Sequence, residues 1–108
     1  MNSGAGATRI SELFRRLREQ GKKGLIAYIT AGDPSPEATA ELALALEAGG
    51  ADLVELGVPF SDPVADGPVI QAASERALRA GTTLRGVLKI AAEIRRSSQI
   101  PLLLFSYL

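Results

Sequence analysis

Three carboxylate side chains lie in one short segment, and they are the residues of this chain best suited to chemistry. Glu55 lies inside an apolar run, and Asp62 and Asp66 follow in a proline-rich stretch, Glu-Leu-Gly-Val-Pro-Phe-Ser-Asp-Pro-Val-Ala-Asp-Gly-Pro over 55–68. An ionised carboxylate among Leu and Val is costly unless it is paired or hydrogen-bonded. A Glu in this position is therefore a candidate for proton transfer as a general acid or base.

Each of these carboxylates also has a purely structural explanation. Glu55 could be paired with a Lys or Arg. Asp66 precedes a Gly and Asp62 precedes a Pro, and Asp is common in such turns because its side chain hydrogen-bonds the nearby backbone. From spacing alone, the turn explanation is the stronger one for both aspartates.

The composition excludes several kinds of catalytic site. The 108-residue sequence contains no Cys and no His, which excludes disulfides, thiolate nucleophiles, Cys/His zinc sites and imidazole catalysis. Its 12 basic and 12 acidic residues give a formal net charge of zero, so charge gives no argument for a nucleic-acid or membrane partner. The apolar runs are too short to span a bilayer, and we expect a cytoplasmic protein.

Alternating helices and strands must position the carboxylates. A helix is predicted after the N-cap Thr8, a second after Ser35, a short third over 69–80, and a fourth after Thr82 or Thr83. The predicted buried stripe of the second helix is Leu42, Ala45 and Leu46. The predicted strands are 25–30, 53–58 and 100–107.

This alternation predicts an α/β fold built from right-handed βαβ units with a parallel sheet. No Gly-x-Gly-x-x-Gly follows the first strand, so a TIM (β/α)8 barrel is favoured over a doubly wound dinucleotide-binding fold. Catalytic groups of a barrel lie at the C-terminal ends of its strands, where Glu55, Asp62 and Asp66 are found. A barrel takes roughly 250 residues. We therefore expect 8–108 to be the N-terminal portion of one, with about three βα units, after a flexible segment 1–7.

The period of a strand predicts which side chains face the barrel interior. Glu55 and Gly57 share one face, and their apolar neighbours in the strand face the helices. Gly57 would then leave room for a ligand beside Glu55. Three aromatic residues fall on the same inward face: Tyr28, Phe105 and Tyr107. They either fill the barrel core or form the walls of a flat slot for an aromatic ring.

The carboxylate segment continues through Val-Ile-Gln to residue 71. Over 55–71 it resembles the signature of the tryptophan synthase α subunit family. Tyr-Ile-Thr-Ala-Gly-Asp-Pro over 28–34 is similar to the first strand and turn of that family, and Leu-Leu-Phe-Ser-Tyr-Leu over 103–108 to its third strand. The resemblance implies a TIM barrel that cleaves indole-3-glycerol phosphate to indole and glyceraldehyde 3-phosphate without a metal or organic cofactor. It also implies an α2β2 complex, in which a PLP-dependent β subunit joins the indole to serine.

The resemblance also implies residue roles. Glu55 matches the acid/base Glu of the family and Asp66 its second catalytic carboxylate, which reverses the preference for a turn role at Asp66. The implied substrate contacts are Tyr28, Phe105 and Tyr107. Phe60 and Asp62 match the loop that faces the β subunit, although Phe60 could pack within the loop and a turn role remains the leading explanation for Asp62.

Three functions remain open at this point. The leading one is the lyase α subunit, and we expect the 108-residue chain alone to be inactive because the phosphate-binding loops of the family lie in the second half of the barrel. The second is a non-catalytic chain that docks on the β subunit. The third is a different phosphate-using TIM barrel, in which Asp62 and Asp66 hold Mg²⁺.

Overall fold

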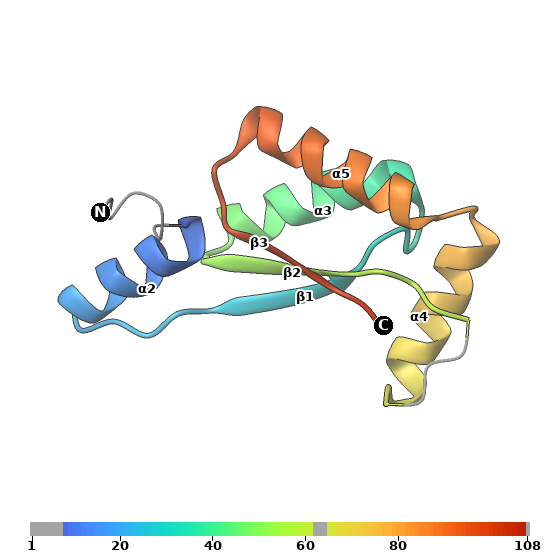
Figure 1. Cartoon of the computed structure of the whole chain (residues 1–108), viewed down its shortest axis with the longest axis horizontal. Helices are drawn as coiled ribbons and strands as arrows, with labels where there is room; N and C mark the ends of the chain where they lie inside the picture. Colours follow the sequence, from blue (N-terminus) through green and yellow to red (C-terminus); the bar gives the residue numbers. More distant parts are fainter. Residues whose placement is uncertain (1–7, 62–64, 108) are drawn as a thin grey trace.

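The computed structural model describes residues 8–61 and 65–107, which form a parallel sheet and the helices around it. In chain order the elements are α2 (Arg9–Glu19), β1 (Ile26–Thr30), α3 (Pro36–Ala48), β2 (Leu53–Gly57), α4 (Pro68–Arg79), α5 (Leu84–Ser97) and β3 (Leu102–Phe105). Helices α3 and α5 lie together on one face of the sheet, α2 lies where the strands begin, and α4 lies where they end (Figure 1). Loops that follow strands therefore gather at the α4 end.

Helices α2, α3 and α5 begin where the sequence predicts, because a capping side chain stands at each of these starts. Thr8 accepts a hydrogen bond from the Ser11 amide, and Ser35 accepts one from the Ala38 amide. Of the two threonines proposed for α5, Thr83 is the cap. Helix α4 begins one residue before its predicted start, and the strands are shorter than the predicted runs at one or both ends.

The sheet has the strand order β1-β2-β3, and both strand pairs are parallel, as predicted. Its register places Tyr28, Glu55 and Leu103 in one row across the three strands, while Gly57 lies beside Thr30 and Phe105 toward the strand ends. One row in the middle of the sheet and one at its C-terminal end therefore contain four of the residues singled out from the sequence.

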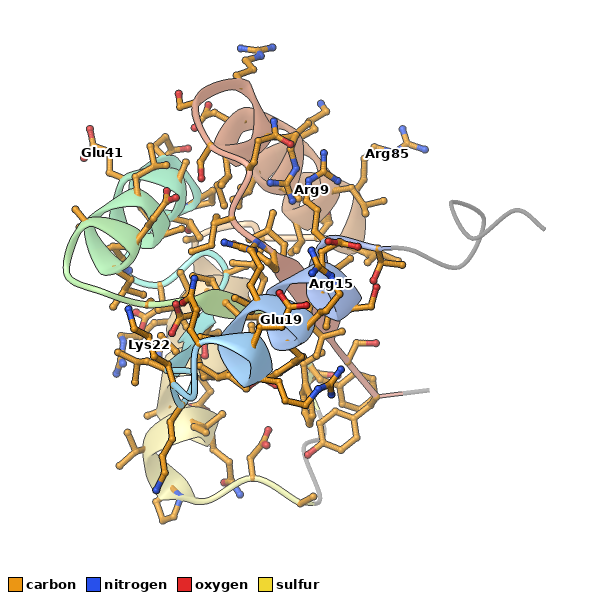
Figure 2. All side chains as sticks on the ribbon, turned by 90° about the vertical axis from the view of Figure 1, so that its left-hand side faces the viewer. Arg9, Arg15, Glu19, Lys22, Glu41 and Arg85 are labelled. Carbon is orange, nitrogen blue, oxygen red and sulfur yellow. The ribbon has the colours of Figure 1, made fainter. Side chains whose placement is uncertain are left out.

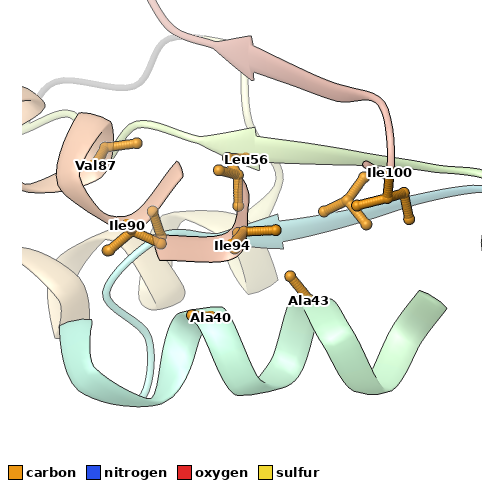
Figure 3. Packing of buried hydrophobic residues seen from close by; sticks show 9 residues of the cluster. Ala40, Ala43, Leu56, Val87, Ile90, Ile94 and Ile100 are labelled. Carbon is orange, nitrogen blue, oxygen red and sulfur yellow. The ribbon is translucent and has the colours of Figure 1, made fainter. Parts of the chain in front are cut away.

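The main hydrophobic core lies between the sheet and the α3–α5 pair (Figure 3). It includes Ala40 and Ala43 of α3, which are buried, whereas Leu42 is 38% exposed and Ala45 is also exposed. The predicted stripe of α3 is thus wrong in most of its members, although Leu46 packs against the edge of the core. Small alanine side chains let α3 approach both β2 and α5, and closeness of packing outweighs the burial of one larger Leu.

Helix α2 covers the end of the sheet where the strands begin. Its Leu13 and Leu17 are buried against Leu53 of β2, and Arg9 donates to the Gln99 side chain in the turn before β3. Figure 2 views the molecule from this end, with the Arg15 side chain of α2 in front. Helix α2 therefore shields the apolar residues at this end of the sheet from solvent.

Three charged residues of α2 form ion pairs along its surface. Arg15 bridges Glu12 and Glu19 at 2.7 and 3.0 Å, and about half of each of the Arg15 and Glu12 side chains is exposed. Among the described residues, no helix has both the length and the apolar character that crossing a bilayer would require.

Candidate active site

Glu55 lies in the middle of β2 and faces away from the hydrophobic core. Its neighbours Val54 and Leu56 are fully buried in the core beneath α3 and α5, and side chains alternate between the two faces of a strand. The Glu55 side chain is half-buried on the opposite face, in the row with Tyr28 and Leu103. Within the described residues, each ion pair joins an Arg to another carboxylate, and none of them reaches Glu55.

The space at Gly57 is filled by the Tyr28 ring. A Cβ atom added to Gly57 would overlap the hydroxyl and ring carbons of Tyr28, so this position requires glycine. The sequence-based expectation that Gly57 leaves room for a ligand is therefore wrong, because the phenol of the neighbouring strand takes that room. The rings of Tyr28 and Phe105 meet edge to face, with centroids 6.4 Å apart, and the Tyr28 hydroxyl receives a long hydrogen bond of 3.4 Å from Thr30.

Tyr107 links the segment after β3 to the loop after β2. Its ring stacks on Phe60, with centroids 4.9 Å apart and an angle of 26° between the planes. Its hydroxyl accepts a hydrogen bond of 3.0 Å from the Ala65 amide. Phe60 remains 37% exposed, so packing within the loops still leaves part of its ring accessible. Asp62 lies outside the described residues.

Asp66 directly precedes the N-terminal end of α4. Its carbonyl oxygen accepts a hydrogen bond of 2.7 Å from the Gln71 side chain, and the Gly67 carbonyl accepts the Gln71 amide at 3.0 Å. These bonds use the backbone carbonyls, and within the part of the chain that the structure describes no hydrogen bond involves the Asp66 carboxylate. The turn is thus built without that half-buried carboxylate, which weakens a purely local explanation for an Asp at this position.

The predicted site residues fall into two contacting groups. Glu55, Tyr28 and Phe105 share the open face of the sheet, and Phe60 and Tyr107 stack above the strand ends. Asp66 adjoins the second group, because the preceding residue donates to Tyr107.

The sequence reasoning missed an ion pair at this end of the sheet. Arg76 of α4 donates to Asp33, in the loop after β1, through two hydrogen bonds of 2.8 and 3.0 Å. These bonds lower the pKa of Asp33, because they favour its ionised form, and they raise the pKa of Arg76. The sequence does contain one indication of this pair, which is the position of Asp33. It follows the first strand, just as the candidate carboxylates Asp62 and Asp66 follow the second.

A cavity of about 260 Å³ lies between β1 and α4 beside this ion pair. Tyr28, Thr30 and Asp33 line it from the β1 side, and Val69 and Arg76 line it from α4. The cavity therefore connects the sheet face that carries Glu55 with the helix that Asp66 precedes.

Comparisons with known proteins agree on one family. The family model described as "Tryptophan synthase alpha chain" matches residues 14–108. Curated proteins named tryptophan synthase alpha chain are 64% identical in Solibacter usitatus, over 101 residues, and 60% identical in Nitrosococcus oceani, over 102 residues. Each alignment covers 94% of this chain but 38% of the relative, so the chain spans well under half the length of these proteins.

Solved structures give the same result. The tryptophan synthase subunit alpha of Legionella pneumophila superposes with a TM-score of 0.91 at 44% identity, covering 94% of this chain and 39% of that one. A structure of the tryptophan synthase a2b2 complex from Pyrococcus furiosus matches with a TM-score of 0.74 at 48% identity, covering 78% and 36%. These neighbours are TIM barrels, and the three parallel strands with their helices match part of that barrel.

Proposed function

The chain belongs to the tryptophan synthase alpha chain family, and from this we propose that its protein cleaves indole-3-glycerol phosphate to indole and glyceraldehyde 3-phosphate. This is a carbon–carbon lyase reaction of tryptophan biosynthesis. The observation that carries the proposal is the environment of the Glu55 carboxylate. It is half-buried on the open face of the sheet and has no cationic partner among the described residues. It also lies within the segment that the family model matches. Biosynthesis of this kind also supports a cytoplasmic location.

Retro-aldol cleavage needs one group that protonates C3 of the indole ring and one that removes the proton of the glycerol hydroxyl. Protonation makes the ring an electron acceptor, so the bond from C3 to the glycerol carbon breaks toward the ring. Loss of the hydroxyl proton turns that carbon into the aldehyde carbon of glyceraldehyde 3-phosphate. We assign both transfers to Glu55, since a single carboxyl can give one proton and then take another.

Asp66 has a complementary role in this proposal. Positive charge develops on the indole nitrogen when C3 is protonated, and an ionised carboxylate that accepts the N–H hydrogen bond stabilises that charge. The position of Asp66 next to the Tyr107 contact supports this role, because the loop is held over the strand ends.

The indole ring itself needs flat apolar walls. Tyr28 and Phe105 meet edge to face beside Glu55, and Tyr107 lies above the strand ends against Phe60. Such a group of aromatic rings suits a bicyclic heteroaromatic substrate. We propose these three side chains as substrate contacts.

The proposed partner is a tryptophan synthase β subunit in an α2β2 complex, and PLP would be bound by that subunit. Support comes from the Pyrococcus furiosus relative, which was solved as an a2b2 complex. Phe60, with 37% of its surface exposed on the loop after β2, is a suitable contact for a partner, and we place Asp62 of the same loop at that interface.

The experiment uses a chimera in which residues 1–108 replace the matching segment of the Solibacter usitatus relative. Release of indole from indole-3-glycerol phosphate is measured with and without a β subunit, and the 108-residue chain is tested in parallel. The proposal predicts that the chimera releases indole, that a β subunit increases the rate, and that EDTA leaves it unchanged. A chimera that binds the β subunit without releasing indole would favour a docking role, and loss of activity in EDTA would favour Mg²⁺ chemistry.

A further inference from the structure

The Asp33–Arg76 ion pair joins two elements that flank the proposed site. Asp33 lies three residues beyond the end of β1, and Arg76 lies in the second half of α4. The side chain of Asp33 is 20% exposed and that of Arg76 is 53% exposed, and the two hydrogen bonds have the paired geometry of guanidinium with carboxylate. Such a pair fixes the relative orientation of the two side chains as well as the distance between them, because the planar guanidinium and carboxylate groups must align.

A second contact anchors the same end of α4. Thr82, just beyond the helix, is buried and packs so tightly on Gly32 that a Cβ atom there would overlap its side chain. Gly32 also has φ +94°, a conformation that favours glycine. The Gly32 amide donates to Thr39 of α3 at 2.9 Å, so the loop that receives α4 is itself fixed to the fold.

Asp66 lies just before the opposite end of α4. Helix α4 begins at Pro68, and the eight residue steps from there to Arg76 correspond to about 12 Å along a helix that rises about 1.5 Å per residue. A hydrogen-bonded helix moves as one body, so a tilt at the Arg76 end displaces the end that Asp66 precedes. The Ala65 amide, beside Asp66, is in turn held by Tyr107.

We propose that Asp33 and Arg76 are positioning residues, which set the place of the Asp66 carboxylate by fixing the orientation of α4 against the loop after β1. The expected loss of rate rests on the proposed function. The expected effect on the orientation of α4 rests on the geometry alone. Neither side chain needs to touch the substrate. A displacement of about 1 Å at a reacting group can lower a rate about 100-fold, so even a small tilt of α4 matters.

The test compares Arg76→Gln with Arg79→Gln in the chimera. Both residues lie on α4, but among the described residues the ion pair of Arg79 is with Glu75 of its own helix, at 4.0 Å. We expect Arg76→Gln to lower kcat by about tenfold to 100-fold with little change in KM, and Arg79→Gln to leave both unchanged. Asp33→Asn should behave like Arg76→Gln, and Arg76→Lys should recover part of the rate because it restores the charge without the two-bond geometry.

A double-mutant cycle separates positioning of Asp66 from general weakening. If the ion pair acts through Asp66, Arg76→Gln should have no further effect on kcat once Asp66→Asn has removed the carboxylate. The same fold-loss in both backgrounds would overturn the proposal. So would an unchanged kcat in Arg76→Gln, or an equal loss in Arg79→Gln.

A measurement on the 108-residue chain keeps this inference separate from the proposed function. Amide hydrogen exchange of Ala65 and Gln71 reports the two hydrogen bonds beside Asp66. Arg76→Gln should speed exchange at both amides, and Arg79→Gln should not. Unchanged exchange in Arg76→Gln would overturn the positioning role, whereas a chimera that fails to release indole would overturn the proposed function alone.

Discussion

Glu55 is the side chain on which the proposed chemistry depends most directly. Glu55→Gln in the chimera keeps the shape and removes the transferable proton, so we expect kcat to fall by about 10²- to 10⁴-fold while KM stays nearly constant. Indole release under saturating substrate gives kcat, and Glu41→Gln, an exposed position on α3, is the control. Near-normal turnover would remove Glu55 from the mechanism.

Gly57 is the residue whose role the structure changes most. Gly57→Ala forces the Tyr28 ring away, and we expect a loss of about 1–3 kcal/mol in the free energy of unfolding, as is typical of overpacking. Urea unfolding of the 108-residue chain at a fixed concentration measures this loss. Gly67→Ala is the matched control, because no atom of the described residues lies within 4 Å of the added Cβ atom. Equal costs for the two variants would contradict the close contact with Tyr28.

Asp33 should make the stability of the fold depend on pH. Arg76 lowers the pKa of Asp33 below its ordinary value of 3.8 in the folded chain, so the pair stabilises the fold above that value. The stabilisation is lost as the pH falls through the lowered pKa, because protonation removes the charge. Solvent screens the half-exposed Arg76, so the effect is small.

The measurement is the urea midpoint of the chain and of Asp33→Asn as a function of pH. The difference between them should be present near neutral pH and should shrink as the pH falls below the ordinary Asp pKa. Glu75→Gln serves as the comparison, since this carboxylate reaches Arg79 only at 4.0 Å. A difference that stays constant to low pH would mean that the Asp33 carboxylate contributes nothing as a charge.

Helix α3 packs through small side chains, and this gives a prediction about the whole element. Ala43→Leu would push α3 away from α5 and the sheet, and we expect it to cost about 1–3 kcal/mol. Ala45→Leu on the same helix adds the same atoms at an exposed position and should cost little. Urea unfolding of the 108-residue chain at a fixed concentration separates the two. A larger cost at Ala45 would restore the stripe predicted from the sequence.

Helix α4 differs from the other helices because it lies at the end of the sheet. Ala73 and Ala77 are buried, and the exposed polar residues of the helix include both the anchor Arg76 and its control Arg79. Its start at Gly67 has no side-chain cap, unlike those of α2, α3 and α5. The placement of α4 therefore depends on contacts with distant segments more than on local signals.

The described part of the molecule leaves one sheet face and two sheet edges open. Ile26, Leu103 and Phe105 on that face are 47%, 41% and 51% exposed, and β1 and β3 each have one neighbouring strand among the described residues. Apolar surface and unpaired strand edges of this kind favour association. A polypeptide of residues 1–108 expressed alone should therefore elute as a dimer or larger species in size-exclusion chromatography. A well-folded monomer would contradict this prediction.

Local signals in the sequence were enough to predict the outline of the fold. The caps Thr8 and Ser35, the alternation of strands with helices, and the parallel sheet are all confirmed, because capping and strand period depend on residues close together in the chain. The placement of Glu55 opposite the core also follows from that period. Its catalytic role and that of Asp66 stay predictions.

Contacts between distant segments could not be predicted in this way. Asp33 and Arg76 are 43 positions apart, Ala65 and Tyr107 are 42 apart, and Tyr28 covers Gly57 from a different strand. No residue pattern within one element encodes such a meeting, because it depends on how helices and strands pack. The sequence thus specified which carboxylates and rings lie at the strand ends, whereas the folded chain specified which of them touch, since only packing brings separate elements within bonding distance.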